Sequence, residues 1–257
     1  VVADACSTGA HEFRVYNLAR AARAAVVLRA NHAPLFAKLA KGAAQRQSEM
    51  VNREVAMLAW AFAVQRALSS KVSRDGTLLT SLASASQRQI LHANTQDLAN
   101  LLWSLAVSFV RHAPLEAAIA SCSSERATEF RPVELVPMIW SCARLPMRSG
   151  PLLDAMTAQL HDKCDDLGPQ HVANAAWAMA SLRLGDGSCC DAKALALDAR
   201  LITRARPYID SFRPQELCNL SWALARWGNR DAPLHRALAV RARSAAQRSV
   251  SEPRALA

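Results

Sequence analysis

The chain has 257 residues, 51% of them apolar, and its 31 Lys and Arg against 21 Asp and Glu give a formal net charge of +10. The apolar content excludes a disordered chain, and the length suits one sizeable domain or two small ones. With only 8 Gly, 5% aromatic residues and many alanines, the composition favours helices over sheet, because Ala is the best helix former. The predicted fold class is all-α, and no apolar run approaches the roughly 18 residues of a membrane-spanning helix.

Charge and cysteine content narrow the expected chemistry. The positive excess is mostly Arg, whose planar guanidinium suits phosphate, so acidic partners are expected. The alternative is that the charge serves solubility alone. Seven cysteines without a C-x-x-C pair indicate neither a disulfide framework nor a zinc ribbon.

Regularly spaced tryptophans divide the chain into repeats. The intervals from Trp103 to Trp140 and from Trp140 to Trp177 are both 37 residues, which we take as the base period. The longer intervals, before Trp103 and after Trp177, imply insertions. Residues 69–76 and 185–191 have the Ser, Gly and Asp content expected of inserted turns. The repeating residues are Trp60, Trp103, Trp140, Trp177 and Trp222.

Each repeat is predicted to contain two helices. The second begins at a Pro-Leu motif, as in Ala113-Pro114-Leu115, because Pro suits the first helical turn. The same motif at Ala33-Pro34-Leu35 marks a degenerate first repeat, whose leading helix is expected at about 12–28 with Leu18 in the Trp position. The first helix otherwise opens eight residues before its Trp, at a residue suited to a helix start: Asn52, Thr95, Pro132, Pro169 or Pro214.

These signals together predict a single helical-repeat domain over residues 1–257. The tail at 249–257 shows no periodicity and is expected to fray. The six predicted helical hairpins lie near 11–47, 48–92, 93–130, 131–167, 168–212 and 213–248.

The apolar stripe on the first helix predicts how the repeats associate. Numbered from the Trp as position 0, apolar residues fall at −5, −4, −2, −1, +2 and +3, a stripe too wide for a helix with one neighbour. A stacked array requires such a stripe, so the expected architecture is an α-solenoid. The Trp side chains are interpreted as part of this core, the alternative being that they are platforms on which bases stack. If they belong to the core, Trp→Ala should cost roughly 3–5 kcal/mol. The recurring Ala at +3 indicates close helix contact: Ala63, Ala106, Ala143, Ala180 and Ala225.

The pattern of the first helix resembles the octotricopeptide and heptatricopeptide repeats of organellar RNA-binding proteins, and the related helical segments of RAP-domain and FAST-kinase-like proteins. Asn174-x-x-Trp177-Ala178-Met179-Ala180 and Asn219-x-x-Trp222-Ala223-Leu224-Ala225 carry the resemblance best. It covers roughly residues 12–247 and is strongest over 95–248. Two repeats depart from it, with Pro137 and Met57 in place of the Asn.

This resemblance implies a non-catalytic protein that binds single-stranded or ribosomal RNA. It further implies an organellar location, with the mitochondrion favoured over the plastid, and membership of a larger ribonucleoprotein assembly such as a mitochondrial ribosome, together with other proteins. No membrane partner is expected.

The polar positions −7, −3, +1 and +4 of the first helix are predicted to form the RNA-facing stripe. Asn and Gln offer both donors and acceptors, which reading a base edge requires. The alternative is that the Asn at −3 hydrogen-bonds the backbone of a neighbouring repeat and fixes the stacking angle. The residues themselves do not separate the two. The candidates for base contacts are Gln96, Asn100, Ser104, Gln170, Asn174, Gln215 and Asn219.

Arginines at equivalent places in the repeats are candidates for phosphate contacts. Some precede the helix-opening Pro, some lie four residues after the Trp, and three cluster ahead of the last repeat. Each phosphate contact would contribute a salt-dependent term to affinity. The candidates are Arg131, Arg144, Arg200, Arg204, Arg206, Arg213 and Arg226.

No catalytic constellation is recognisable in the sequence. A Gly-rich phosphate loop, H-E-x-x-H and G-x-S-x-G are all absent. His161-Asp162-Lys163-Cys164 lacks partners at metal-ligand spacing and is interpreted as a polar turn. We therefore expect no catalytic residues, cofactor or metal. The main competing function is a protein-interaction scaffold of HEAT or tetratricopeptide type.

Overall fold

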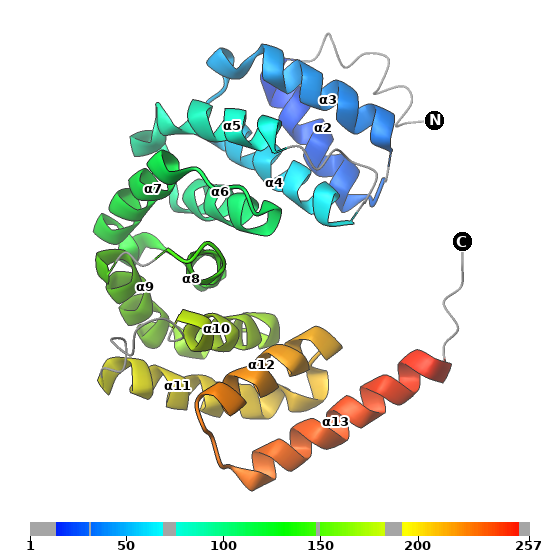
Figure 1. The fold of residues 1–257 in the computed structure, drawn as a ribbon, viewed down its shortest axis with the longest axis vertical. Coiled ribbons are helices and arrows are strands. Elements are labelled where there is room, and N and C mark those ends of the chain that lie inside the picture. The colour runs from blue at the N-terminus through cyan, green and yellow to red at the C-terminus, as the bar shows by residue number, and fades with distance from the viewer. Residues whose placement is uncertain (1–13, 31, 69–75, 148–149, 183–191, 252–257) are drawn as a thin grey trace. The chain divides into compact units, whose positions relative to one another are not determined.

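A computed structural model describes residues 14–30, 32–68, 76–147, 150–182 and 192–251 of the chain (Figure 1). Over these ranges the regular structure consists of twelve α-helices and short 3₁₀ segments, with no strand. The all-α prediction is therefore confirmed, and the arrangement is repeat-like. None of the helices described is long and apolar enough to cross a membrane.

The helices alternate between two kinds. The first helices are α2 (Val15–Val27), α4 (Asn52–Leu68), α6 (Thr95–Ser108), α8 (Pro132–Arg144), α10 (Pro169–Leu182) and α12 (Pro214–Arg226). The second helices are α3 (Ala33–Gln45), α5 (Thr77–Gln87), α7 (Ala113–Glu125), α9 (Gly150–Asp162), α11 (Ala192–Ala205) and α13 (Ala232–Ser251). Short 3₁₀ segments precede the next first helix: η1 (Gln47–Glu49), η2 (Ile90–His92), η3 (Ala127–Glu129), η4 (Cys164–Asp166) and η5 (Arg206–Ser211).

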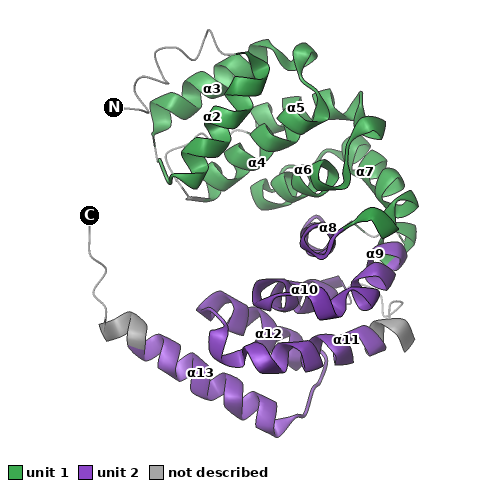
Figure 2. Cartoon of the chain, turned by 180° about the vertical axis from the view of Figure 1, so that it is seen from behind, with its two compact units in different colours: residues 1–130, 147–153 green, residues 131–146, 154–257 purple. Residues whose placement is uncertain are grey.

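The chain forms two compact units, shown in different colours in Figure 2. Unit 1 comprises residues 1–130 and 147–153, and unit 2 comprises residues 131–146 and 154–257. Within unit 1, α4 packs against both α2 and α6; within unit 2, α10 packs against both α8 and α12. The single-domain organisation expected from the repeats stays a prediction.

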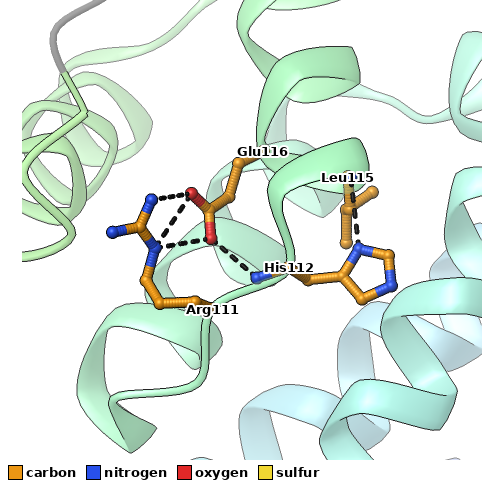
Figure 3. A network of polar contacts seen from close by, with 4 residues as sticks. All are labelled: Arg111, His112, Leu115 and Glu116. Carbon is orange, nitrogen blue, oxygen red and sulfur yellow. Dashed lines mark hydrogen bonds and ion pairs between the residues drawn. The ribbon is translucent and has the colours of Figure 1, made fainter.

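The starts of the second helices show why the Pro-Leu motif folds as it does (Figure 3). The Nδ1 atom of His112 accepts the backbone N–H of Leu115 at 3.2 Å, which satisfies one of the unpaired donors of the first turn. The Glu116 carboxylate accepts the His112 N–H at 2.8 Å and pairs with Arg111, whose Nη2 lies 2.8 Å away. The equivalent His32 accepts from Leu35 at 3.1 Å. The residue before Ala-Pro-Leu is therefore the helix cap.

The alanines at +3 are buried on α4, α6 and α10, half-buried on α8 (Ala143) and exposed on α12. Ala63 and Ala106 are fully buried and Ala180 is 2% exposed, so neighbouring helices approach closely at these positions, as predicted. Ala225 on α12 is exposed instead, because within the described residues α12 packs against α10 but has no further first helix beyond it.

The degenerate first repeat has a different register from the predicted one. Helix α2 starts at Val15, so the residue eight positions later, equivalent to Trp60 on α4, is Arg23. Leu18 is fully buried and corresponds to Val55 and Leu98, which are also fully buried. Leu18 therefore lies at a core position of the helix, and Arg23, not Leu18, takes the Trp position.

Other boundary predictions meet the limits of the described residues. Helix α13 continues through Ser251, so the first residues of the expected frayed tail are helical, and 252–257 lie outside the described residues. The predicted insertion at 185–191 lies outside them too, and of the insertion at 69–76 only Gly76 is described, at the start of α5.

Candidate nucleic-acid interface

Each of the first helices α4, α6, α8, α10 and α12 has a row of accessible positions. On α10, Gln170 is exposed and Asn174, Trp177 and Ser181 are half-buried, whereas Ala178 is fully buried. These accessible residues are at −7, −3, 0 and +4, a spacing that keeps them on one side of a helix. We call these positions the accessible row. The predicted stripe was therefore wrong at two positions: it included +1, which is buried, and it omitted position 0, the Trp.

The Trp side chains belong to this accessible row as much as to the core. Trp60, Trp103, Trp140 and Trp177 are half-buried and Trp222 is 37% exposed. In unit 2 the ring centroids of Trp140 and Trp177 lie 6.0 Å apart at 38°, and those of Trp177 and Trp222 lie 6.0 Å apart at 33°. We call these three rings the Trp row. The Trp side chains are thus only partly in the core in which the sequence placed them, so Trp→Ala should cost less than the full roughly 3–5 kcal/mol.

Asparagine side chains connect neighbouring first helices beside the Trp row. Asn219 Nδ2 donates to Asn174 Oδ1 at 3.0 Å, and Gln215 Nε2 donates to Asn219 Oδ1 at 3.0 Å. This geometry agrees with the alternative in which the Asn at −3 holds neighbouring repeats together. The partner of Asn219 is the Asn174 side chain, however, and not the backbone. Because an amide has two donor hydrogens and an oxygen with two lone pairs, these bonds leave capacity for a base edge.

The remaining base candidates divide between surface and interior. Gln96 and Gln170 are exposed, and Asn100 is half-buried. Ser104 is fully buried, and its hydroxyl donates to the Asn100 carbonyl oxygen at 2.6 Å. Ser104 therefore does not reach the accessible row, and we leave it out of the proposed interface.

Several of the phosphate candidates are already engaged within the protein. The Arg131 guanidinium pairs with Glu134 at 2.5 Å, and Arg200 pairs with Asp165 at 2.6 Å. Arg206 pairs with Asp231, and Arg204 donates to the Leu167 carbonyl oxygen at 3.0 Å. Except for Arg131 at the start of α8, these arginines lie on α11 and η5 and not on the first helices that carry the accessible row.

The arginines at +4 of α8 and α12 lie beside the Trp row. Arg144 is exposed, with its guanidinium carbon 5.5 Å from the centroid of the Trp140 ring, a distance at which a cation attracts an aromatic face. Arg226 is exposed at the equivalent place on α12, and Arg213 is exposed just before that helix. Aromatic rings, amides and cations therefore share one face of unit 2.

His171 at −6 on α10 is half-buried, and burial lowers its pKa from the ordinary 6.5. The unfolded chain therefore binds a proton at this position more readily than the folded chain does. The contribution of neutral His171 to stability is fully present above about pH 6.5 and is lost as the pH falls below that value. Between pH 7.5 and 5.5 the unsubstituted chain should lose more melting temperature than the His171→Gln variant, measured by circular dichroism. Equal losses in the two proteins would contradict the assigned cause.

No protein-family model matches the chain, and a search of curated proteins finds no significant match. Among the residues described, no group of three or more His, Cys, Asp or Glu side chains is placed to hold a metal ion. The accessible row is equipped for stacking, hydrogen bonding and charge pairing.

Proposed function

We propose that the chain is a non-catalytic RNA-binding protein built as an α-solenoid of octotricopeptide-like repeats. The observation that carries the proposal is the Trp row of unit 2, flanked by Arg144 and Arg226 and by the Asn174–Asn219 pair. Single-stranded nucleic acids bind to such combinations, because bases stack on aromatic faces at about 1–3 kcal/mol each and cations hold the phosphates. The net charge of +10 supports the same class of partner.

In this proposal each group of the accessible row has a distinct role. The partly exposed indoles offer surfaces for bases, and Trp222, the most exposed of them at 37%, is the most accessible stacking position. The guanidinium groups of Arg144 and Arg226 contact phosphates. The amides of Gln170, Asn174, Gln215 and Asn219 supply donors and acceptors for base edges while the Asn pair keeps α10 and α12 in register.

The cellular setting follows from the resemblance of the repeats to those of organellar RNA-binding proteins. We propose a mitochondrial ribonucleoprotein assembly, such as the mitochondrial ribosome, in which the chain contacts ribosomal or other RNA and neighbouring proteins. The two Asn-x-x-Trp-Ala motifs, at 174–178 and 219–223, carry this resemblance.

Binding to single-stranded RNA should weaken steeply between about 50 and 200 mM salt, because each neutralised phosphate releases counterions and contributes about 0.7 to the slope of log K against log salt. Fluorescence anisotropy with a labelled oligonucleotide measures the slope. A flat salt dependence, or no binding at the lowest salt, would sink the RNA proposal.

A protein scaffold is the second candidate, favoured by one observation. Val133, at −7 on α8, is 50% exposed on the accessible row, where an apolar side chain suits a protein surface better than a phosphate. Partners that stay bound to the purified chain after nuclease treatment, together with absent RNA binding, would favour the scaffold.

A further inference from the structure

Unit 1 contains a pocket of about 440 Å³ on the accessible side of α2, α4 and α6. This volume falls within the roughly 300–1,000 Å³ range of small-molecule pockets. Helix α2 contributes one cation and one apolar side chain, α4 a cation, a thioether and an indole, and α6 two amides and a carboxylate. The lining residues are Arg23, Val27, Arg53, Met57, Trp60, Gln96, Asp97 and Asn100.

The corrected repeat register explains why these groups meet. Arg23 occupies the position that Trp60 occupies on α4, and Arg53 and Gln96 occupy the equivalent −7 positions of their helices. The guanidinium that replaces the indole at position 0 of α2 gives the pocket wall a second cation in addition to Arg53. Both arginines are exposed, and no ion pair engages either of them within the part of the chain that the structure describes.

The single carboxylate of the pocket is committed to the helix start. Asp97 is 7% exposed; its backbone N–H donates to Asn94 Oδ1 at 2.8 Å, and its side chain accepts a hydrogen bond from the Asn94 backbone. Burial raises the pKa of the carboxyl, an effect that this hydrogen bond and the charge of Arg53 oppose. With two cations and at most one anion, the pocket favours an anionic ligand.

We propose that this pocket binds one nucleotide, with its phosphate on Arg23 and Arg53 and its base against the Trp60 indole. Guanidinium groups suit phosphate oxygens, an indole stacks with a base, and the Gln96 and Asn100 amides supply donors and acceptors for the base edge. This pocket adds a specific binding site to the proposed function. It depends on that function only if the nucleotide belongs to an RNA strand. The source of the nucleotide is either an RNA strand or a free nucleotide, which share this chemistry.

Isothermal titration of the full chain with adenosine 5′-monophosphate, adenosine and inorganic phosphate tests the pocket. The monophosphate should bind at least tenfold more tightly than either fragment, because only it engages the cations and the indole together. The Arg23→Glu/Arg53→Glu variant should lose at least tenfold in affinity for the monophosphate. The matched Lys38→Glu/Lys41→Glu variant, which changes two exposed cations on α3, should stay within twofold.

Two further measurements keep the result decisive. Circular dichroism melting checks that the variants fold, and Arg23→Gln/Arg53→Gln repeats the test without reversed charge. If the monophosphate binds no better than phosphate, or the pocket variants bind it normally, the assignment is wrong.

The source of the nucleotide is tested with a single-stranded RNA hexamer. If the pocket variants lose affinity for the hexamer as well as for the monophosphate, the ligand is a nucleotide of an RNA strand; if they lose affinity for the monophosphate alone, it is a free nucleotide. Monophosphate binding without RNA binding would remove the proposed function while leaving the pocket assigned.

Discussion

Replacing Arg144 and Arg226 together by Glu is expected to weaken binding of single-stranded RNA by roughly tenfold or more at about 0.1 M salt. Both side chains are exposed at the +4 positions beside the Trp row, so their reversal removes two proposed phosphate contacts and adds repulsion. The slope of log K against log salt should fall by about 1.4, which is two contacts of about 0.7 each. Fluorescence anisotropy across a salt series measures both quantities.

The matched control reverses two arginines of α13, in the same unit. Arg236 and Arg243 are exposed on α13, so Arg236→Glu/Arg243→Glu makes the same change in net charge away from the Trp row. This control should lose only the smaller, general electrostatic part of the affinity. Equal losses in the two variants would show that RNA does not use the face of α8, α10 and α12.

Replacing Ala180 by Leu is expected to lower the free energy of unfolding by about 1–3 kcal/mol, because extra methylene groups overpack a filled core. Ala180 is 2% exposed on α10, which packs against both α8 and α12. Ala225 occupies the same repeat position on α12 but is exposed, so Ala225→Leu should change stability by no more than about 0.5 kcal/mol. Urea unfolding followed by circular dichroism measures both variants.

The comparison of the two alanines tests the packing of the repeats. A large loss in Ala225→Leu would mean that the outer face of α12 is covered, and no loss in Ala180→Leu would mean that α10 is not held closely between its neighbours. Neither outcome depends on RNA, so the pair separates the architecture from the function.

Local sequence signals located the helices well. Pro132, Pro169 and Pro214 mark the starts of α8, α10 and α12 in the structure as they do in the sequence, because a residue without a backbone N–H is favoured only in the first helical turn. His32 and His112 each precede Ala-Pro-Leu, and each caps the helix that follows. The repetition of His before this motif is the sequence signal that indicates a cap.

The accessible row was only partly predictable. Gln170, Asn174 and Gln215 could be placed on it from their polarity and spacing, but Trp177 could not, because an indole is equally suited to a core and to a partly exposed face. The useful signal was the spacing of four and three residues from Gln to Asn to Trp, which keeps all three on one side of a helix. The pairing of Arg131 with Glu134 could similarly have been suspected from their three-residue spacing at a helix start.

By itself the sequence determined the all-helical class, the starts of most helices and the residue types that recur at each repeat position. Caps, Pro and apolar periodicity are local signals, because each depends only on residues a few positions apart in the chain. Only the tertiary structure decided that Arg23 takes the place of a Trp on α2, that the Trp row is partly exposed, and that Asn219 bonds Asn174. These properties depend on which helices lie beside each side chain. Burial is set by neighbours far away in the chain, and a helical period alone does not identify them.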